Sequence, residues 1–421
     1  MNEPEKPPRD ADVEGAPRPT SARLGSVDAY RGLVMFLMMA EVLRLKSMAD
    51  SHPGSAFWKT LAWHQHHVDW VGCTLHDMIQ PSFSFLVGVA LPFSIASRLG
   101  RGQSPVGMTL HALWRAFVLV ALGVFLRSMH SDSTTFTFED TLSQIGLGYP
   151  FLFMLGFRPR RDQWIAFWVI VVGYWAAFAL YSPGTGFSYA DVGVPGSFKE
   201  VAAGFASHWN KNANLAWRFD LWFLNLFPRP TPYRFNAGGY QTLSFIPTLA
   251  TMILGLLAGG VIKSDRPSLG KVAWLVVAGV VALAAGWLLG WLGVCPVVKR
   301  IWTPSWVLYS GGICFLMLAG FYQLVDLFRL RAFFFPLIVI GMNSIVAYCI
   351  AHMIEPFLKS TMRIHGWMAL NPLSSVWKWL FHEDFATSIK GDEVFLQGCC
   401  VLFAYWLILF WMYRRRIFLR I

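Results

Sequence analysis

Apolar runs of about 20 residues, the length that an α-helix needs to cross the hydrocarbon of a bilayer, divide this chain. Backbone inside a bilayer must satisfy its own hydrogen bonds, so runs of this kind restrict the fold to transmembrane helices. We place about ten spans near residues 26–43, 77–97, 108–127, 142–156, 163–181, 242–262, 272–292, 305–325, 333–354 and 394–413.

Composition supports an all-α, polytopic helical membrane protein. Of the 421 residues, 55% are hydrophobic and 14% are charged, whereas a soluble domain carries about a quarter charged residues. A net charge of +11 would suggest nucleic acid in a soluble protein. Here the basic residues lie in short loops, where orientation and anionic lipid explain them better. We therefore expect a lipid bilayer as a partner and no nucleic acid.

The chain is expected to form one transmembrane domain over residues 23–421. Residues 1–22 are polar and proline-rich, which predicts a disordered cytoplasmic tail and no cleavable signal peptide. Residues 182–240 form a long outer loop rich in Gly, Pro, Trp and Asn. The segment WKWLF (377–381) is too short to span and is expected to lie in the membrane interface.

Loop charge predicts the orientation. Basic residues concentrate on one side of the ten predicted spans, which the positive-inside rule makes cytoplasmic, so both termini are expected inside. Residues 64–77 and 182–240 then face outward, and Lys299 and Arg300 contradict the trend. The basic residues on the inner side are Arg23, Arg98, Arg101, Arg158, Arg160, Arg161, Lys263, Arg266, Arg329, Arg331, Arg414, Arg415 and Arg416.

The stretch HQHHVDWVGCTLHD (64–77) gathers histidines and carboxylates at the mouth of a predicted span. Ionisable groups in such a place are costly unless they pair, face water or perform chemistry, and histidine exchanges protons near neutral pH. We interpret the stretch as the edge of an active site. Two alternatives stay open: solvated loop histidines without a role, and a zinc site of His66, His67, Asp69 and His76. Nothing in the spacing requires zinc, and we expect no metal.

Two predicted spans carry polar stripes at helical spacing. In span 77–97, Asp77, Gln80, Ser84 and Gly88 share one face, which can line a site or form a helix–helix seam. The small residues of span 242–262 favour packing.

Span 333–354 contains the second stripe. Ser344, Tyr348, His352 and Glu355 share a face of a continuous helix, with Asn343 about 100° away from Ser344. A lone intramembrane histidine is often just a satisfied hydrogen-bond partner. Because this face carries hydroxyl, phenol, imidazole and carboxylate groups together, we expect it to line a site.

The inner ends of the first and third spans are basic. Asp28 and Arg31 can pair locally at i, i+3, and Arg31 can also neutralise a phosphate arriving from the cytoplasm. His111 and Arg115 lie near the same inner face.

Several motifs of the sequence resemble those of a known family. RLGSVDAYRGLVMFLMM (23–39), followed by HVDWVGCTLHDMIQPSFSFLVGVAL (67–91), is similar to the catalytic domain of the heparan-α-glucosaminide N-acetyltransferases and their bacterial homologues. The family pattern is R-L-x-S-x-D-x-[FY]-R-G, then H-x-x-W-x-G-x-T-x-x-D with an apolar P-x-F-x-F-x-x-G continuation. Residues 242–259, 299–308 and 341–354 resemble later segments of that family, so the resemblance covers nearly the whole chain.

The resemblance implies an acyltransferase that takes acetyl from cytoplasmic acetyl-CoA and delivers it to a sugar amine or hydroxyl across the membrane. The active-site histidine of the family falls on His67, and Asp77, Asn343 and His352 match motif positions. Since coenzyme A carries phosphates, we expect the donor to contact Arg31, Arg98 and Arg115 at the inner ends of the first three spans. Asp28, Asn343, Ser344 and His352 are expected to line the site.

The chain departs from the family near the outer end of the first span. Where the lysosomal enzyme has an asparagine, this chain has Val42 with Glu41 beside it, and it inserts residues between that span and His67. Heparan sulfate is therefore not the expected acceptor, and an envelope glycan or amino sugar is expected instead. The expected location is a bacterial inner membrane, and a homodimer stays open.

Two mechanisms of acyl transfer and one alternative function are consistent with these residues. His67 can deprotonate the acceptor as it attacks the thioester, or it can carry the acetyl group as a nucleophile. In a transporter or flippase of a glycan or amphiphile, the polar stripes would be a substrate path and the histidines a proton relay.

Overall fold

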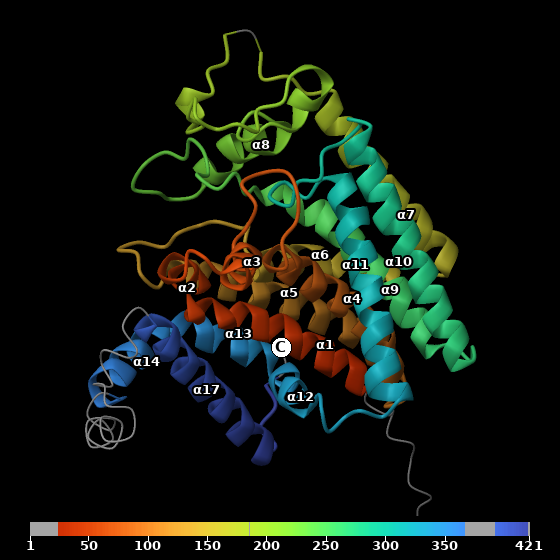
Figure 1. The fold of residues 1–421 in the computed structure, drawn as a ribbon. Helices are drawn as coiled ribbons and strands as arrows, with labels where there is room; N and C mark the ends of the chain where they lie inside the picture. The colour runs from red at the N-terminus through yellow and green to blue at the C-terminus, as the bar shows by residue number, and fades with distance from the viewer. Residues whose placement is uncertain (1–23, 185, 367–391, 420–421) are drawn as a thin grey trace, which may run out of the picture.

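The protein is a bundle of helices with a folded cap at one end (Figure 1). The computed structural model describes residues 24–184, 186–366 and 392–419, so the predicted tail (1–22) and the segment 377–381 lie outside the described residues. Within these ranges the chain is helical, and its only β-pairing is an isolated bridge between Val71 and Val298. The prediction of an all-α membrane protein is confirmed.

The helices follow the order of the predicted spans. The bundle consists of α1 (Gly25–Met39), α4 (Ile79–Leu99), α5 (Pro105–Ser128), α6 (Thr141–Leu155), α7 (Arg160–Ala179), α9 (Phe245–Lys263), α10 (Ser268–Trp291), α11 (Pro304–Phe321), α12 (Phe335–Met342), α13 (Ser344–Met353) and α17 (Glu393–Arg414). Shorter elements are α2 (Leu45–Ser51), α3 (Ala56–Gln65), α8 (Leu215–Phe223), α14 (Glu355–Thr361) and the 3-10 turns η1 (Ala40–Leu43) and η2 (His76–Met78).

The number of spans differs from the sequence-based prediction. Among the described residues, 7 helices can cross a membrane by length and composition, or up to 8 if the bent pair α12–α13 forms one span, so the count of about ten is not confirmed. Helices α1 and α6 have 15 residues each. At 1.5 Å per residue they reach about 22 Å, less than the roughly 30 Å of hydrocarbon. The α12–α13 pair is bent by 81° at Asn343.

Glycines allow the central helices to touch backbone to backbone. A Cβ placed on Gly88 of α4 would overlap the carbonyl oxygen of Met252 on α9, and one placed on Gly255 of α9 would overlap that of Phe85 on α4. Gly32 and Leu337 meet in the same way between α1 and α12. The packing role expected for the small residues of span 242–262 is confirmed, and the Gly88 position of span 77–97 is part of the same seam.

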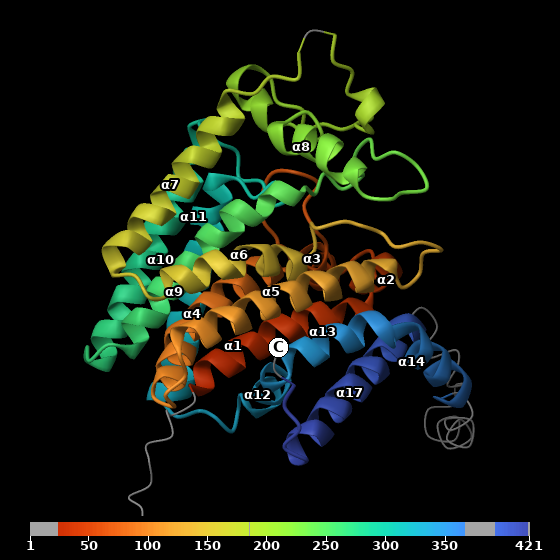
Figure 2. The ribbon, with the colours of Figure 1, turned by 180° about the vertical axis from the view of Figure 1, so that it is seen from behind.

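Residues 186–240 fold into a cap over one end of the bundle, with α8 at its centre (Figure 2). The buried side chain of Asn212 donates to the carbonyl oxygens of Val192 and Asn236, at 3.0 and 2.9 Å, and so ties the two ends of the cap together. Gly239, at φ +80, lies against the ring of Trp70, where any side chain would collide. The cap therefore meets the loop after α3 directly.

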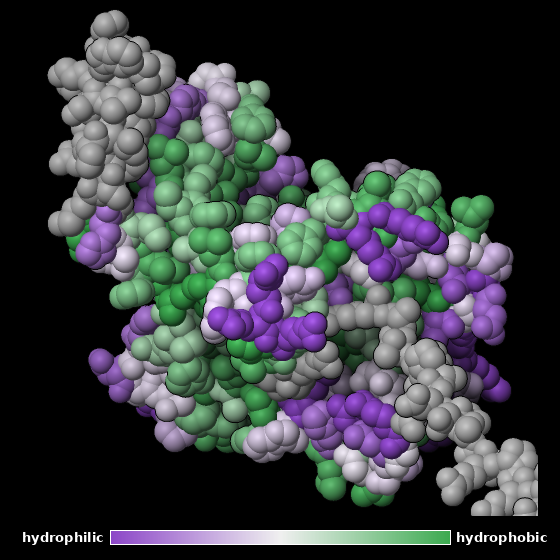
Figure 3. Space-filling view, turned by 90° about the horizontal axis from the view of Figure 1, so that it is seen from below, coloured by the Kyte–Doolittle hydropathy of each residue, from purple (hydrophilic) through white to green (hydrophobic). Residues whose placement is uncertain are grey.

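The opposite end of the bundle carries hydrophilic groups separated by hydrophobic surface (Figure 3). Exposed basic residues lie there at the end of α9 and before α12. Lys263 is the last residue of α9 and Arg266 follows it, and Arg329 and Arg331 precede α12. This distribution agrees with the predicted charge bias, and which side of the membrane it faces stays a prediction.

A matched pair of glycine substitutions tests the α4–α9 contact. Gly88→Ala forces the two backbones apart, and we expect it to destabilise the protein by about 1–3 kcal/mol. Gly173→Ala on the exposed face of α7 meets no atom within 4 Å and is expected to leave stability unchanged or slightly improved. The measurement is thermal unfolding in detergent, and equal melting temperatures would contradict the packing described here.

Candidate active site

His67 and Asp77 form a hydrogen-bonded pair beneath the cap. His67 lies in the segment between α3 and η2, and Asp77 lies in η2, directly before α4. The distance between His67 Nδ1 and Asp77 Oδ1 is 2.7 Å. The carboxylate side chain is 1% exposed and the imidazole is 36% exposed. Because Nδ1 donates its proton to Asp77, Nε2 is the ring nitrogen that remains able to accept a proton.

The loop between His67 and Asp77 folds around the Asp77 carboxylate. Asp77 Oδ2 accepts hydrogen bonds from the backbone nitrogen of Val68 (3.3 Å) and from both the nitrogen and the hydroxyl of Thr74 (3.0 Å each). Gly72, at φ +119, reverses the chain between these donors. The spacing of His, Thr and Asp in this motif therefore has a structural cause: Thr74 and Asp77 close the loop that orients His67.

Lys299 completes the pair as a buried cation. Its Nζ lies 3.3 Å from Asp77 Oδ1 and 3.2 Å from His67 Nδ1, and the residue is 4% exposed. Burial lowers the pKa of Lys299 although Asp77 opposes this effect. Burial also lowers the pKa of His67, and the charge of Lys299 lowers it further. His67 is therefore held as a neutral imidazole at neutral pH, the form that accepts a proton.

The two basic residues that contradict the predicted charge bias, Lys299 and Arg300, both have structural roles at the site. Lys299 is engaged with Asp77. Arg300 donates to the carbonyl oxygens of Val68 and Gly238, and its guanidinium lies 5.2 Å from the ring centre of Tyr240. Contacts at the site account for the position of both residues.

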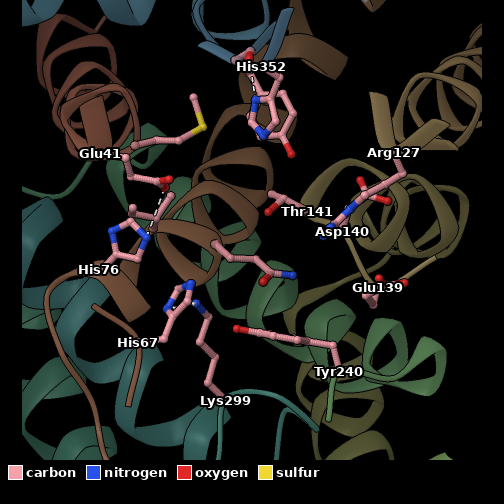
Figure 4. Close-up of a pocket in the computed structure, with 14 residues that line it drawn as sticks. Glu41, His67, His76, Arg127, Glu139, Asp140, Thr141, Tyr240, Lys299 and His352 are labelled. Carbon is pink, nitrogen blue, oxygen red and sulfur yellow. Dashed lines mark hydrogen bonds and ion pairs between the residues drawn. The ribbon is translucent and has the colours of Figure 1, made fainter. Parts of the chain in front are cut away.

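His67 opens into a cavity of about 200 Å³ between the bundle and the cap (Figure 4). Lys299 and His76 lie on the same side as His67, and the side chains of Arg127, Glu139 and Asp140 lie across from them. The complete lining is Met38, Glu41, His67, His76, Ile79, Gln80, Arg127, Glu139, Asp140, Thr141, Tyr240, Lys299, Tyr348 and His352.

The structure separates the residues of the stripe predicted for span 333–354. Tyr348 and His352 line the cavity, with their rings stacked at 4.4 Å. Ser344 is not among the lining residues. The prediction that Glu355 continues the same helical face is wrong, because α13 ends at Met353 and Glu355 begins α14, where it pairs with Lys359.

We expected Asn343 and Ser344 to lie on one continuous helix. The structure differs, because the chain bends at Asn343, between α12 and α13. Its backbone has φ −127 and ψ 43. The buried amide donates to the carbonyl oxygen of Ile417 at 2.9 Å, and its oxygen accepts from the nitrogen of Leu419 at 3.2 Å. Asn343 thus fixes the segment after α17 and lies outside the cavity.

The arginines predicted to bind the donor do not line the His67 cavity. Arg31 pairs with Asp28 at 3.5 Å, so the local pairing considered for these two residues is present. Arg115 donates to the hydroxyl of Tyr149 at 3.1 Å and lies over its ring. Arg98 lies in the last turn of α4. Their role towards a donor remains a prediction.

Two other histidines of the stretch, His64 and His66, do not line the His67 cavity. His64 Nδ1 accepts from the nitrogen of Leu75 at 3.3 Å, and His66 lines a larger cavity outside the first. Among the residues described, no group of three or more His, Cys, Asp or Glu side chains is placed to hold a metal ion.

Sequence reasoning missed Lys299, Arg127, Glu139 and Tyr240 as site residues. Lys299 could have been suspected, because it is a basic residue on the side of the predicted spans where basic residues are scarce. Asp140 could also have been suspected as a helix N-cap from its position directly before an apolar run, and in the structure it accepts from the nitrogens of Leu142 and Ser143. Nothing in the sequence marks the remaining ones.

Comparison with known proteins gives two curated relatives. The chain is 25% identical over 392 residues to human (Homo sapiens) heparan-alpha-glucosaminide N-acetyltransferase and 24% identical over 389 residues to that of mouse (Mus musculus). Each alignment covers 81% of this chain and 55% of the relative, so the chain spans about half the length of the curated relatives it matches. No model of a protein family matches the chain.

Removing the buried cation tests the electrostatics of the pair. Lys299→Met takes away a positive charge beside His67 Nδ1, so we expect the pKa of His67 to rise. Lys59→Met, at an exposed site on α3, is the matched control and is expected to leave that pKa unchanged. The measurement is an NMR titration of histidine ring carbons, with His67 assigned by its loss in His67→Gln. An unchanged or lower His67 pKa in Lys299→Met would contradict this electrostatic account.

Proposed function

From its family-level relationship to the heparan-α-glucosaminide N-acetyltransferases, we propose that this protein is a membrane acetyltransferase. Its donor is acetyl-CoA and its acceptor is an amine or hydroxyl of an envelope glycan or amino sugar. The observation that carries the proposal is the His67–Asp77 pair, whose free ring nitrogen faces a cavity. A transporter or flippase is the weaker candidate, since the relatives are named as acetyltransferases.

The geometry of His67 suits general-base catalysis. Nε2 accepts the proton of the acceptor as its nitrogen or oxygen attacks the thioester carbonyl, and it then gives that proton to the leaving thiolate. Asp77 keeps the ring in the tautomer with Nδ1 protonated and stabilises the imidazolium that forms, as the aspartate does in serine hydrolases. Such a step contributes roughly 10²–10⁴-fold in rate.

An acetyl-histidine intermediate uses the same Nε2 as a nucleophile. The two mechanisms differ in one measurable respect, because only an acetyl-histidine releases one equivalent of coenzyme A before any acceptor is added. We favour the general base, since a proton can pass to and from Nε2 while the ring stays in place between Asp77 and Lys299.

The donor is proposed to approach from the end of the bundle opposite the cap, where Arg31, Arg98 and Arg115 would contact the phosphates of coenzyme A. Charge-assisted hydrogen bonds of this kind contribute about 1.5–3 kcal/mol each. Asp28 would hold Arg31 in position through their ion pair. This arrangement corresponds to a protein in a bacterial inner membrane with both termini in the cytoplasm.

The proposal is tested with purified protein, acetyl-CoA and glucosamine as the probe acceptor. We expect thiol release coupled to N-acetylglucosamine formation, and His67→Ala should lower the rate at least about 10²-fold. His64→Ala is the matched control: it removes a nearby imidazole that does not line the cavity, and its rate should stay near wild type. Thermal unfolding of both variants controls for folding. A His67→Ala protein with normal activity would rule out the proposed role.

A further inference from the structure

A second histidine–carboxylate pair lies beside the first. His76 Nε2 is 3.2 Å from Glu41 Oε1. The rings of His67 and His76 have their centres 4.5 Å apart. Glu41 comes from η1 at the end of α1 and His76 from η2 before α4, so two different elements bring this pair to His67. The mechanism described above does not use it.

The second pair lies where two cavities meet. A larger cavity of about 790 Å³ adjoins the inner one, and both are lined by Glu41, His67 and His76. A volume of this size is typical of small-molecule sites, and its other walls are polar, with residues such as Arg44 and Gln65. A sugar in the outer cavity therefore lies beside Glu41 and His76 as well as His67.

Glu41 has negative charge available for a ligand. Its side chain is 57% exposed, whereas that of His76 is 9% exposed. Within the described part of the chain, the ion-pair partner of Glu41 is this histidine and not a lysine or arginine. An exposed carboxylate at the entrance to a reaction cavity attracts a cationic group.

An amine acceptor creates a need for such a pair. At neutral pH it arrives as an ammonium ion, R–NH₃⁺, which has no lone pair for attack. It must lose one proton before the C–N bond forms and a second one as the amide forms. His67 has one free ring nitrogen and handles one of these protons.

We propose that Glu41 and His76 form the acceptor-side site, which binds the ammonium group and takes its first proton. The free amine then attacks the acetyl carbonyl, the C–S bond breaks, and His67 passes the second proton to the leaving thiolate. The balance is R–NH₃⁺ plus acetyl-CoA giving R–NH–acetyl, coenzyme A thiol and one proton, which leaves through the outer cavity. This inference rests on the proposed function and assigns the acceptor as an amine.

The test compares two acceptors with the same protein. Glucosamine is largely an ammonium ion at pH 7, whereas hydroxylamine is a neutral nucleophile and needs no first deprotonation. We expect Glu41→Gln and His76→Gln to lower kcat/KM for glucosamine at least ten-fold more than kcat/KM for hydroxylamine. Asp132→Asn, which removes an exposed carboxylate that lines neither cavity, is the control and should leave the ratio of the two unchanged.

The outcomes separate the two proposals. If Glu41→Gln and His76→Gln lower both acceptors equally, the pair has only a structural role and the inference is overturned, while the proposed function stands. If both variants keep the wild-type ratio and rate, the inference is likewise overturned. If the wild-type protein acetylates neither acceptor, the proposed function fails and the inference with it.

Discussion

The buried carboxylate of Asp77 is the group on which the rest of the site depends. A carboxylate removed from water is costly unless donors surround it, and here they come from Val68, Thr74, His67 and Lys299. These donors belong to the loop after α3 and to the segment before α11. The contacts around the Asp77 carboxylate therefore hold together two segments that lie far apart in sequence, and they do so beside the His67 cavity.

The same interaction sets the chemistry of His67. Asp77 fixes the ring orientation and would stabilise a proton on it, whereas burial and Lys299 act against that proton. The net effect lowers the pKa of His67 and favours the neutral imidazole, the form that can accept a proton. A histidine that was simply solvated would lack the orientation, and one paired with Asp77 alone would be more easily protonated. Lys299 thus lowers the pKa of His67, a role that the distribution of loop charges did not predict.

The sequence predicted most of what depends on local pattern. Apolar runs located the helices, and the resemblance to a known family singled out His67 and Asp77, which the structure brings together. Hydropathy does not report bending, so the 81° break at Asn343 was missed, and with it the position of Glu355. Hydropathy also counted α1 and α6 as membrane spans, because both are apolar, although each helix has only 15 residues. The contact of Lys299 with Asp77 could not be predicted, because it depends on how distant helices pack.

In the proposed mechanism, His67 and Asp77 act as one catalytic unit. A double-mutant cycle of His67→Gln and Asp77→Asn, measured as the rate of acetyl transfer to glucosamine, tests it most directly. If the account is right, the double variant will be no slower than the slower single variant, because each substitution already disables the unit. Losses that multiply in the double variant would show independent roles and contradict the account.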